Sequence, residues 1–451
     1  MATPENRPNV VVFFTDQQRW DTTGVHGNPM GLTPNFDRVA QEGTHCYNAC
    51  SCQPVCKPVR LSLQTGTYAS RFNAYHNGST ELPADATTIA HCFQDAGYTT
   101  GYIGKWHLGR ENPVPRERRT GYDYWLAAEA LEHTSDAYHT TVYDNEGQPV
   151  NLPGYRVDGL TDAAIRFISD NQDEPFFLFT SFLEPHFQNH RDDYPAPTGY
   201  EERYLDCWMP PDLRALGGSA ARHLPGYYGM VKRLDEAFGR VLDALKSLGL
   251  EENTIVVFTT DHGCHFKTRN GEYKRSCHDA SIRVPLALQG PGFDGGGRLK
   301  DMISLVDLPP TLMDACNVPI PESVQGRSFL PLTKGKREGW REEAYVEIFD
   351  PPYLCRAVRT QRWKYAIKRK EEGLDDLSSW TFVEDSLYDL RADPYELNNL
   401  IGLSSHRHVA DVLKERLVRN MRDAGEREPE IENAPEGGSG QKSVSQSESY
   451  E

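Results

Sequence analysis

The sequence predicts an α/β fold: a large mixed, mostly parallel sheet sandwiched by helices, followed by a smaller antiparallel subdomain. In the first 332 residues, short continuous apolar runs alternate with segments of helical periodicity. Such runs are typical of strands that are buried on both faces of a sheet. Beyond that point short strand-like segments follow one another, with turns between them. Strands that alternate with helices indicate a doubly wound sheet, and consecutive strands indicate an antiparallel one.

Four apolar runs carry the strand pattern: Asn9–Thr15, Thr99–Ile103, Phe176–Thr180 and Thr254–Thr259. Four segments with helical spacing separate or follow them: Pro34–Glu42, Thr87–Ala96, Thr161–Asn171 and Val231–Leu248. In a doubly wound sheet, the ligand crevice lies beyond the carboxyl ends of the strands. We therefore expect the polar residues that follow these runs to meet at one edge: Asp16, Lys105, His186 and Asp261.

Composition divides the chain into three parts. We expect a main α/β domain over residues 1–332 and an α+β subdomain over residues 333–431. The subdomain has strand-like segments at Ala344–Ile348, Arg356–Arg359 and Trp363–Ile367, and a terminal helix around His408–Asp423. Residues 432–451 are polar and rich in Gly, Ser and Glu, so we expect a disordered tail there.

Charge and composition narrow the possible partners and locations. The net charge of -17 argues against nucleic acid as a partner, because neutralising phosphates requires clustered Lys and Arg. The start of the chain lacks a basic segment followed by an apolar one, and no run of about 18 apolar residues occurs. The ten cysteines are too few to suggest a disulfide framework. We therefore expect a cytoplasmic protein that does not span a membrane.

The most specific motif surrounds Cys56. Pro58 and Arg60 follow it at fixed spacings, and Thr65-Gly66 extends the pattern. A lone cysteine is usually a buried structural thiol, but this combination favours a functional one. A zinc cluster is the alternative, and it would use Cys46, Cys50, Cys52 and Cys56. Their spacing lacks the usual paired pattern and no His pair accompanies them, so we favour zinc less.

Two further motifs end predicted strands. Asp16-Gln17 follows the first run, and Asp261-His262 follows the run at Thr254–Thr259. An aspartate at a strand end often caps the next helix, but two such pairs at equivalent ends favour a metal site. Oxygen ligands suit a hard divalent cation, of which calcium is the best candidate, with magnesium or manganese as alternatives.

A third group could bind an anion and move protons. Residues 104–109 read Gly-Lys-Trp-His-Leu-Gly and contain Lys105 and His107. His186 follows a proline after the third strand, and Lys274 lies eight residues before Ile282. Lone lysines and histidines are usually surface or structural groups, so the contiguous motif gives Lys105 and His107 the stronger case.

Together these motifs resemble the signature of the type I (formylglycine-dependent) sulfatases, within the alkaline-phosphatase-like superfamily. The resemblance extends over most of the chain, through Leu32–Gly43, Leu305–Pro321 and Leu387–Leu400. It implies that a separate maturation enzyme oxidises Cys56 to formylglycine. One hydroxyl of the hydrated aldehyde would attack sulfur and displace the alcohol, and the other would expel sulfate by collapse of the hemiacetal. Val59 stands where many members of the family have serine.

The resemblance also implies a role for each candidate residue. The metal ligands would be Asp16, Gln17, Cys56, Asp261 and His262. Lys105 would bind a sulfate oxygen, and His107 would take the proton when the hemiacetal collapses. His186 and Lys274 would face the leaving oxygen, with His186 as the better general acid. Arg60 would bond the hydrated aldehyde, although a structural salt bridge is its alternative role.

These roles point to hydrolysis of a sulfate monoester, and a small or oligomeric sugar sulfate is the expected substrate. The alternative is a phosphonate monoester or phosphodiester hydrolase. Such hydrolases are relatives of the sulfatases that share the formylglycine and have the same Asp-Gln and Asp-His pairs as this chain. The motif at residues 104–109 favours the sulfatase. A non-catalytic binding protein would be expected to lack Cys56, Lys105 or Asp261. Polar residues near the motifs could contact the sugar, His265 among them: His76, Asn77, His265, Lys267 and Arg269.

Overall fold

The structure, a computed structural model, describes residues 7–74, 76–78, 81–350, 352–370 and 380–451. A ten-stranded mixed sheet forms its larger part, in the order β10-β2-β9-β8-β1-β7-β3-β4-β5-β6. Five central strands run parallel to one another: β8 (Thr254–Thr260), β1 (Asn9–Thr15), β7 (Phe176–Ser181), β3 (Thr99–Lys105) and β4 (Tyr124–Ala128). This confirms the predicted α/β fold with a mostly parallel sheet.

The remaining strands extend the sheet on both sides. On one side β9 (Leu286–Gln289) is antiparallel to its neighbours, and β2 (Thr44–Cys50) and β10 (Gly297–Ser304) pair in parallel beyond it. On the other side β5 (Thr140–Tyr143) and β6 (Pro149–Leu152) form an antiparallel edge.

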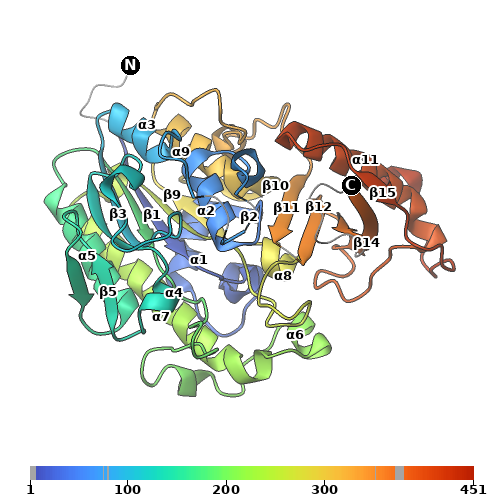
Figure 1. The fold of residues 1–451 in the computed structure, drawn as a ribbon, viewed down its shortest axis with the longest axis horizontal. Helices are drawn as coiled ribbons and strands as arrows, with labels where there is room; N and C mark the ends of the chain where they lie inside the picture. Colours follow the sequence, from blue (N-terminus) through green and yellow to red (C-terminus); the bar gives the residue numbers. More distant parts are fainter. Residues whose placement is uncertain (1–6, 75, 79–80, 351, 371–379) are drawn as a thin grey trace.

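Helices cover both faces of this sheet (Figure 1). One layer contains α2 (Cys56–Thr65), α3 (Ile89–Asp95) and α9 (Leu308–Ala315), and the other contains α1 (Pro34–Glu42), α5 (Arg156–Asp170) and α7 (Ala220–Ser247). Strand β1 serves both layers because its side chains alternate between the faces. Val10 and Val12 pack in the first core, and Val11 and Phe13 in the second.

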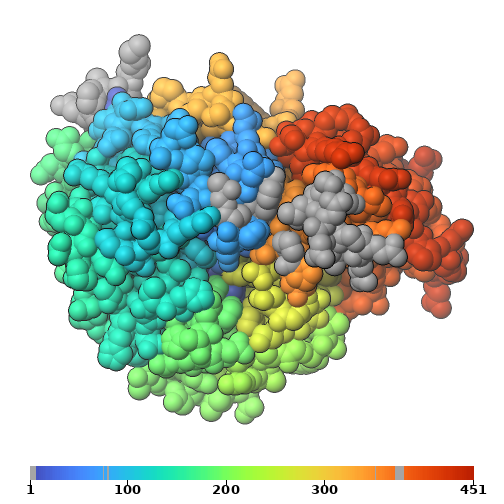
Figure 2. Space-filling model, viewed as in Figure 1, coloured from blue at the N-terminus to red at the C-terminus, as the bar shows by residue number. Residues whose placement is uncertain are grey.

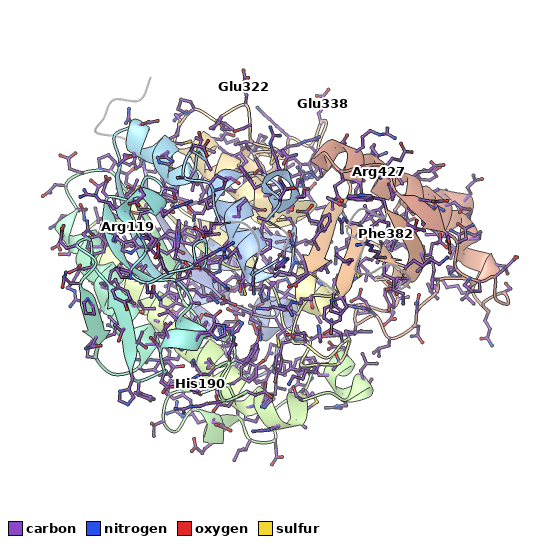
Figure 3. The ribbon with its side chains drawn as sticks, viewed as in Figure 1. Arg119, His190, Glu322, Glu338, Phe382 and Arg427 are labelled. Carbon is purple, nitrogen blue, oxygen red and sulfur yellow. The ribbon has the colours of Figure 1, made fainter. Side chains whose placement is uncertain are left out.

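The C-terminal part is a second, five-stranded sheet with one long helix. Its strands are β11 (Ala344–Asp350), β12 (Tyr353–Arg359), β13 (Trp363–Arg369), β14 (Thr381–Asp389) and β15 (Glu430–Glu432), and α11 (Arg407–Ala424) packs on them. The first four strands are antiparallel. Phe382, labelled in Figure 3, is buried in the core between this sheet and α11. In Figure 2 this part, in orange and red, lies directly against the larger part.

Buried charges join the two parts. Asp279 of the short helix α8 (Asp279–Ile282) binds Arg359 of β12 at 2.9 Å and Lys364 of β13 at 3.3 Å. All three residues are buried. The domain boundary expected after Leu332 falls within the short helix α10 (Leu330–Thr333), and that boundary stays a prediction.

The end of the chain differs from the disordered tail that composition predicted. Beyond β15, a short 3-10 helix at Gln446–Tyr450 lies against the C-terminal part. The indole nitrogen of Trp363 donates to the Glu448 carbonyl, and Arg362 binds the carboxylates of Glu448 and Glu451. Val444 is buried in the same core. A polar segment can therefore be held by partners that composition does not reveal.

The parallel register brings the ends of the central strands together. Thr15 of β1 pairs with Thr260 of β8, while Ser181 of β7 pairs with Phe14 and with Gly104 of β3. The residues that follow these strands therefore emerge at one edge of the sheet, as predicted. In the described part of the chain, no helix is both long enough and apolar enough to cross a membrane.

Candidate active site

The predicted site residues converge beyond the carboxyl ends of β1, β3, β7 and β8. The first turns of α2 bring Cys56 and Arg60 to the same place, and the loop after β8 adds Lys274. A pocket of about 740 Å³ opens above them. Its lining includes His107, His186 and Lys274.

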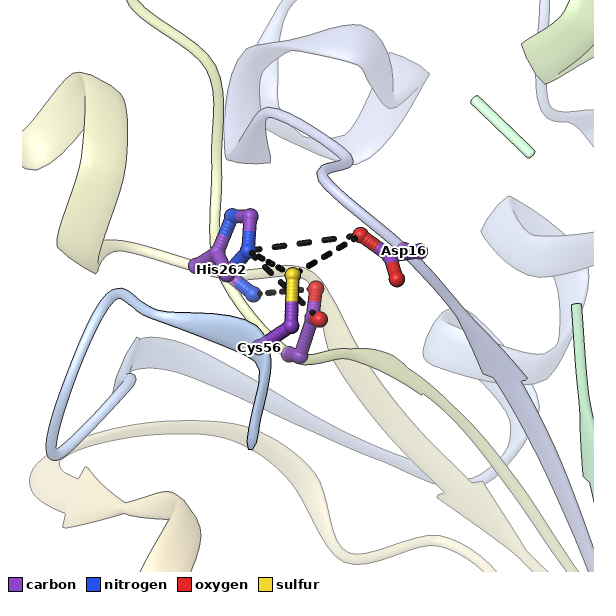
Figure 4. Close-up of side chains that lie close together, drawn as sticks. Asp16, Cys56 and His262 are labelled. Carbon is purple, nitrogen blue, oxygen red and sulfur yellow. Dashed lines mark hydrogen bonds and ion pairs between the residues drawn. The ribbon is translucent and has the colours of Figure 1, made fainter. Parts of the chain in front are cut away.

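A buried cluster lies at the centre of the site (Figure 4). Ligand atoms of Asp16, Cys56, Asp261 and His262 all lie within 4.8 Å of one another. The Cys56 Sγ is 3.2 Å from His262 Nε2 and 3.8 Å from Asp16 Oδ1. Among the described residues, this is the one such cluster of His, Cys, Asp and Glu, so Cys46, Cys50 and Cys52 do not form a second one.

The donor atoms of this cluster fit a hard cation. Gln17 Oε1 and Asp261 Oδ2 are buried and have no hydrogen-bond partner among the described residues. The Gln17 amide nitrogen donates to the Tyr194 hydroxyl at 3.1 Å, which orients the amide. The His262 Nδ1 lies 2.9 Å from the Gly263 carbonyl, so it carries the proton and leaves Nε2 as an acceptor. Burial and the charge of Lys274 hold the pKa of His262 well below its usual value, which keeps the ring neutral.

The two aspartates have opposite pKa shifts. Burial alone would raise the pKa of Asp16, but the charges of Lys105 and Arg60 lower it well below its usual value. Burial and the neighbouring Asp16 raise the pKa of Asp261 to about 6. Two carboxylates this close repel each other, and a bound cation would relieve that repulsion.

Cations surround Asp16. Arg60 Nη2 and Lys105 Nζ each lie 2.8 Å from Asp16 Oδ2. Lys105 also binds Glu132 Oε1 at 2.7 Å, and Arg60 donates to the Ser181 hydroxyl at 2.8 Å. Sequence reasoning missed Glu132 and Ser181, because neither belongs to a recognisable motif.

Lys274 and His186 lie on the pocket side of Cys56. Lys274 Nζ is 2.7 Å from the Cys56 Sγ and 3.1 Å from His186 Nε2. The His186 Nδ1 is 2.7 Å from the Phe187 carbonyl, so it donates there and Nε2 accepts from Lys274. Burial and the charge of Lys274 lower the pKa of His186 well below its usual value, so its ring is neutral and can accept this hydrogen bond. Burial and Asp16 raise the pKa of the Cys56 thiol to about 12, and it stays protonated at neutral pH.

The backbone is strained at two site residues. Gln17 has a φ of 64° and His107 a φ of 58°, in the left-handed region that side chains rarely adopt. Gly104 is required where it stands, because a Cβ there would overlap the Ser181 carbonyl oxygen. Hydrogen bonds from the backbone of Trp106 and His107 to Ala128 and Glu129 hold the following turn beneath the pocket.

Some predicted substrate contacts lie elsewhere. The His265 ring is fully buried and bonds the Lys274 carbonyl at 2.9 Å, so it does not line the pocket. Lys267 pairs with Asp192, and Arg269 donates to the backbone of Tyr395. These three residues lie near the motifs in sequence but are not among the residues that line the pocket, whereas Asn77 does line it.

Comparison with known proteins agrees with this geometry. The sulfatase family model matches residues 8–318, and a model described as N-sulphoglucosamine sulphohydrolase, C-terminal, matches residues 271–423. An ulvan-active sulfatase of Formosa agariphila is 33% identical over 441 residues, which cover 93% of this chain and 82% of that one. An N-acetylglucosamine-6-O-sulfatase of Bacteroides thetaiotaomicron is 25% identical over 508 residues and covers 94% of this chain and 88% of its own length.

Solved structures share the fold. The yidJ structure from Bacteroides fragilis has a TM-score of 0.80 and 26% identity, covering 94% of this chain and 97% of that one. The phosphonate monoester hydrolase of Agrobacterium radiobacter has a TM-score of 0.72 and 24% identity, covering 93% of this chain and 96% of its own. At that identity the second likeness establishes the fold alone. Because the family model spans more than half of the chain, the protein belongs to the sulfatase family of the alkaline-phosphatase-like superfamily and is a sulfuric ester hydrolase.

Proposed function

We propose that this sulfatase hydrolyses sulfate monoesters of small or oligomeric sugars, after a maturation enzyme has oxidised Cys56 to formylglycine. The observation that carries the proposal is the position of Cys56. Its sulfur lies within 4 Å of Asp16, His262 and Lys274, directly below the pocket. Two relatives add support for a sugar substrate, since they are named ulvan-active sulfatase and N-acetylglucosamine-6-O-sulfatase.

Asp16, Gln17, Asp261 and His262 would hold a divalent cation, together with the modified residue 56. Their oxygen-rich donor set favours calcium, with magnesium or manganese as alternatives. A bound cation would supply positive charge against the sulfate oxygens and stabilise negative charge as it develops.

The chain's own residues divide the remaining work. Lys105 would hold a sulfate oxygen, and Glu132 fixes the direction of its side chain. Arg60, which is buried and bound to Asp16, would bond the hydrated aldehyde. The His186–Lys274 pair would deliver a proton to the departing alcohol, since the two side chains are hydrogen-bonded and both line the pocket. His107, which lines the pocket, would accept the proton when sulfate is released.

A direct test compares two substrates. Purified protein should turn over an aryl sulfate faster than the matching aryl phosphonate, because the family and its named relatives are sulfatases. Faster turnover of the phosphonate would overturn the proposal and favour the phosphonate hydrolase. Activity on a panel of sulfated oligosaccharides would then define the sugar. The cytoplasmic location expected from the sequence stays a prediction.

A further inference from the structure

Lys57 is a buried cation for which the described residues provide no counter-ion. It follows Cys56 in the first turn of α2 and lines the pocket together with His107. The residue is 3% exposed, and its Nζ donates to the Gly109 carbonyl at 2.9 Å. No carboxylate of the described part of the chain lies within 4.0 Å of that nitrogen.

Most other cations at or beside the pocket pair with carboxylates, and Lys274, which does not, contacts Cys56 and His186 at the reaction centre. Lys105 binds Asp16 and Glu132, and Arg275 binds Glu272 and Asp350. An ammonium has three donors, and Lys57 uses one of them on a neutral carbonyl. A buried charge without a partner costs free energy, so such a group in a ligand pocket points to an anion that the ligand brings.

The surroundings of Lys57 are fixed and do not neutralise it. The Gly109 amide donates to both oxygens of Glu129, at 3.0 and 3.1 Å, so the residue Gly109 lies between this acid and the lysine. Burial raises the pKa of Glu129 to about 7, which leaves it partly protonated at neutral pH. The Lys57 backbone donates to Asn77 Oδ1 at 3.1 Å, and Asn77 lines the same pocket.

We propose that Lys57 forms a subsite for a second anionic group of the substrate, bound beside the sulfate that is hydrolysed. The group would be a carboxylate or a second sulfate on the same sugar or on the adjoining one. Its oxygens would accept the two remaining ammonium donors as charge-assisted hydrogen bonds. This inference rests on the proposed function and makes the substrate class more specific: a sulfated sugar with at least one further negative charge.

Three sulfated sugars that differ in one substituent test the subsite: one with a neighbouring carboxylate, one with a second sulfate and one with a neutral group. In the wild type, kcat/KM should be higher for at least one anionic sugar than for the neutral one. Lys57→Met should reduce that ratio about 10- to 100-fold, the range expected for a hydrogen bond to a charged group. Lys57→Arg should retain much of it. The anionic sugar whose ratio falls identifies the group. Lys246→Met, on the exposed end of α7, is the matched control and should leave the ratio unchanged.

A binding measurement separates this inference from the proposed function. The desulfated carboxylate sugar, the sugar that keeps only the second sulfate and their neutral counterpart can each be titrated into protein with an unmodified Cys56, because binding requires no turnover. Lys57→Met should weaken binding of the preferred anionic sugar about 10-fold or more and that of the neutral sugar little. If neither anionic sugar binds the wild type better than the neutral one, or if Lys57→Met weakens the anionic and neutral sugars equally, the subsite is refuted. Lys57-dependent binding without any sulfate hydrolysis would keep the subsite and refute the function.

Discussion

Cys56 is the residue on which the proposed chemistry depends, because a plain thiol has no second hydroxyl with which to expel sulfate. In active protein, the peptide that contains Cys56 should weigh about 18 Da less than its sequence requires, as thiol is replaced by aldehyde. Peptide mass spectrometry measures this. Cys56→Ala should abolish turnover and change the melting temperature little, because the truncation removes one sulfur atom. Cys92→Ala, on α3, should retain full activity. Full activity with an intact thiol at residue 56 would contradict the mechanism.

The metal ligands allow a test that does not depend on activity. Asp16→Asn and Asp261→Asn each remove one anionic oxygen from the buried cluster, so both variants should lose bound metal. Elemental analysis of purified protein measures occupancy. Asp95→Asn, at an exposed position on α3, serves as the control and should keep its metal. Full occupancy in both cluster variants would show that the ligands were assigned wrongly.

His186 and His107 are assigned to opposite halves of the reaction. A proton donor matters most when the leaving group is a poor one. His186→Ala breaks the His186–Lys274 pair that would supply the proton, so it should harm sugar sulfates about 100-fold more than a nitrophenyl sulfate. His107→Ala should slow sulfate release for every substrate and give a burst of alcohol followed by slow turnover. Mass spectrometry should then detect sulfate on residue 56. His139→Ala, at an exposed position, is the control. The assignment would be refuted if His186→Ala loses the same fraction of activity on every leaving group and His107→Ala traps no sulfate on residue 56.

The sequence predicted the site residues that belong to contiguous motifs, and the structure brings these together. It could not predict Glu132, which reaches Lys105 only because α4 (Leu131–Thr134) folds over the sheet edge. His265 was expected at the substrate because it is close to the motifs in sequence. Its ring turns toward the backbone of Lys274 instead, and no pattern of residue types encodes that direction.

At the scale of elements, the sequence predicts those helices and strands whose residues are apolar on one face or throughout. Strand β1 and helix α1 begin and end where the sequence placed them. Helix α2 was not predicted as a helix, because it is buried on all sides and its polar residues serve the site, so it lacks an amphipathic pattern. The short strands β5 and β6 were also missed, since four residues at a sheet edge carry little signal.

The start of α1 depends on a residue from another helix. Thr33 makes no capping hydrogen bond, and Asp235 of α7 accepts from the backbone of Asn35 at 3.0 Å and of Phe36 at 2.8 Å. Burial opposes the charge and raises the pKa of Asp235 to about 6, although these bonds lower it. The folded state therefore binds this proton more tightly than the unfolded state does.

A stability measurement against pH tests this cap. Because the folded pKa is raised, the contribution of Asp235 is largest at low pH and falls as pH rises from about 4 to about 6. The difference in unfolding free energy between wild type and Asp235→Asn should shrink over that window by on the order of 2 kcal/mol. Urea unfolding at several pH values measures it, with Asp243→Asn, exposed on the same helix, as the control. If the difference in unfolding free energy grows between pH 4 and 6, the pKa of Asp235 is not raised in the folded state.

At the scale of the whole molecule, sequence texture predicted a second, antiparallel part but not how firmly it is joined to the first. The junction consists of buried charges that lie far apart in sequence, such as Asp279 with Arg359. Long-range pairing of this kind has no local signature. The order of the C-terminal tail could not be predicted for the same reason, because its residues Glu448 and Glu451 bind Arg362, which is distant in sequence.

Asp279 should couple the two parts into one cooperative unit. Burial would raise the pKa of Asp279, but Arg359 and Lys364 lower it below its usual value, so the carboxylate is charged at neutral pH. Asp279→Asn leaves two buried cations without that charge, and Glu396, which also binds Lys364, remains the nearby carboxylate. Removing one partner of a buried pair costs about 3–5 kcal/mol. Asp301→Asn breaks a pair with the exposed Arg337 and should cost less than about 1 kcal/mol.

Urea unfolding followed by tryptophan fluorescence and circular dichroism measures both variants. The wild type should unfold in one transition, and Asp279→Asn should either lower its midpoint strongly or split it in two, because the C-terminal sheet loses its main buried link to α8. Turnover should fall as well, since Lys274 lies five residues before Asp279 in the segment that this link holds. If Asp279→Asn is as mild as Asp301→Asn in midpoint and in turnover, these buried charges do not couple the two parts. Other contacts, such as the packing of Met302 on Ala344 and the bond from the Glu347 amide to the Cys52 carbonyl, would then hold them together.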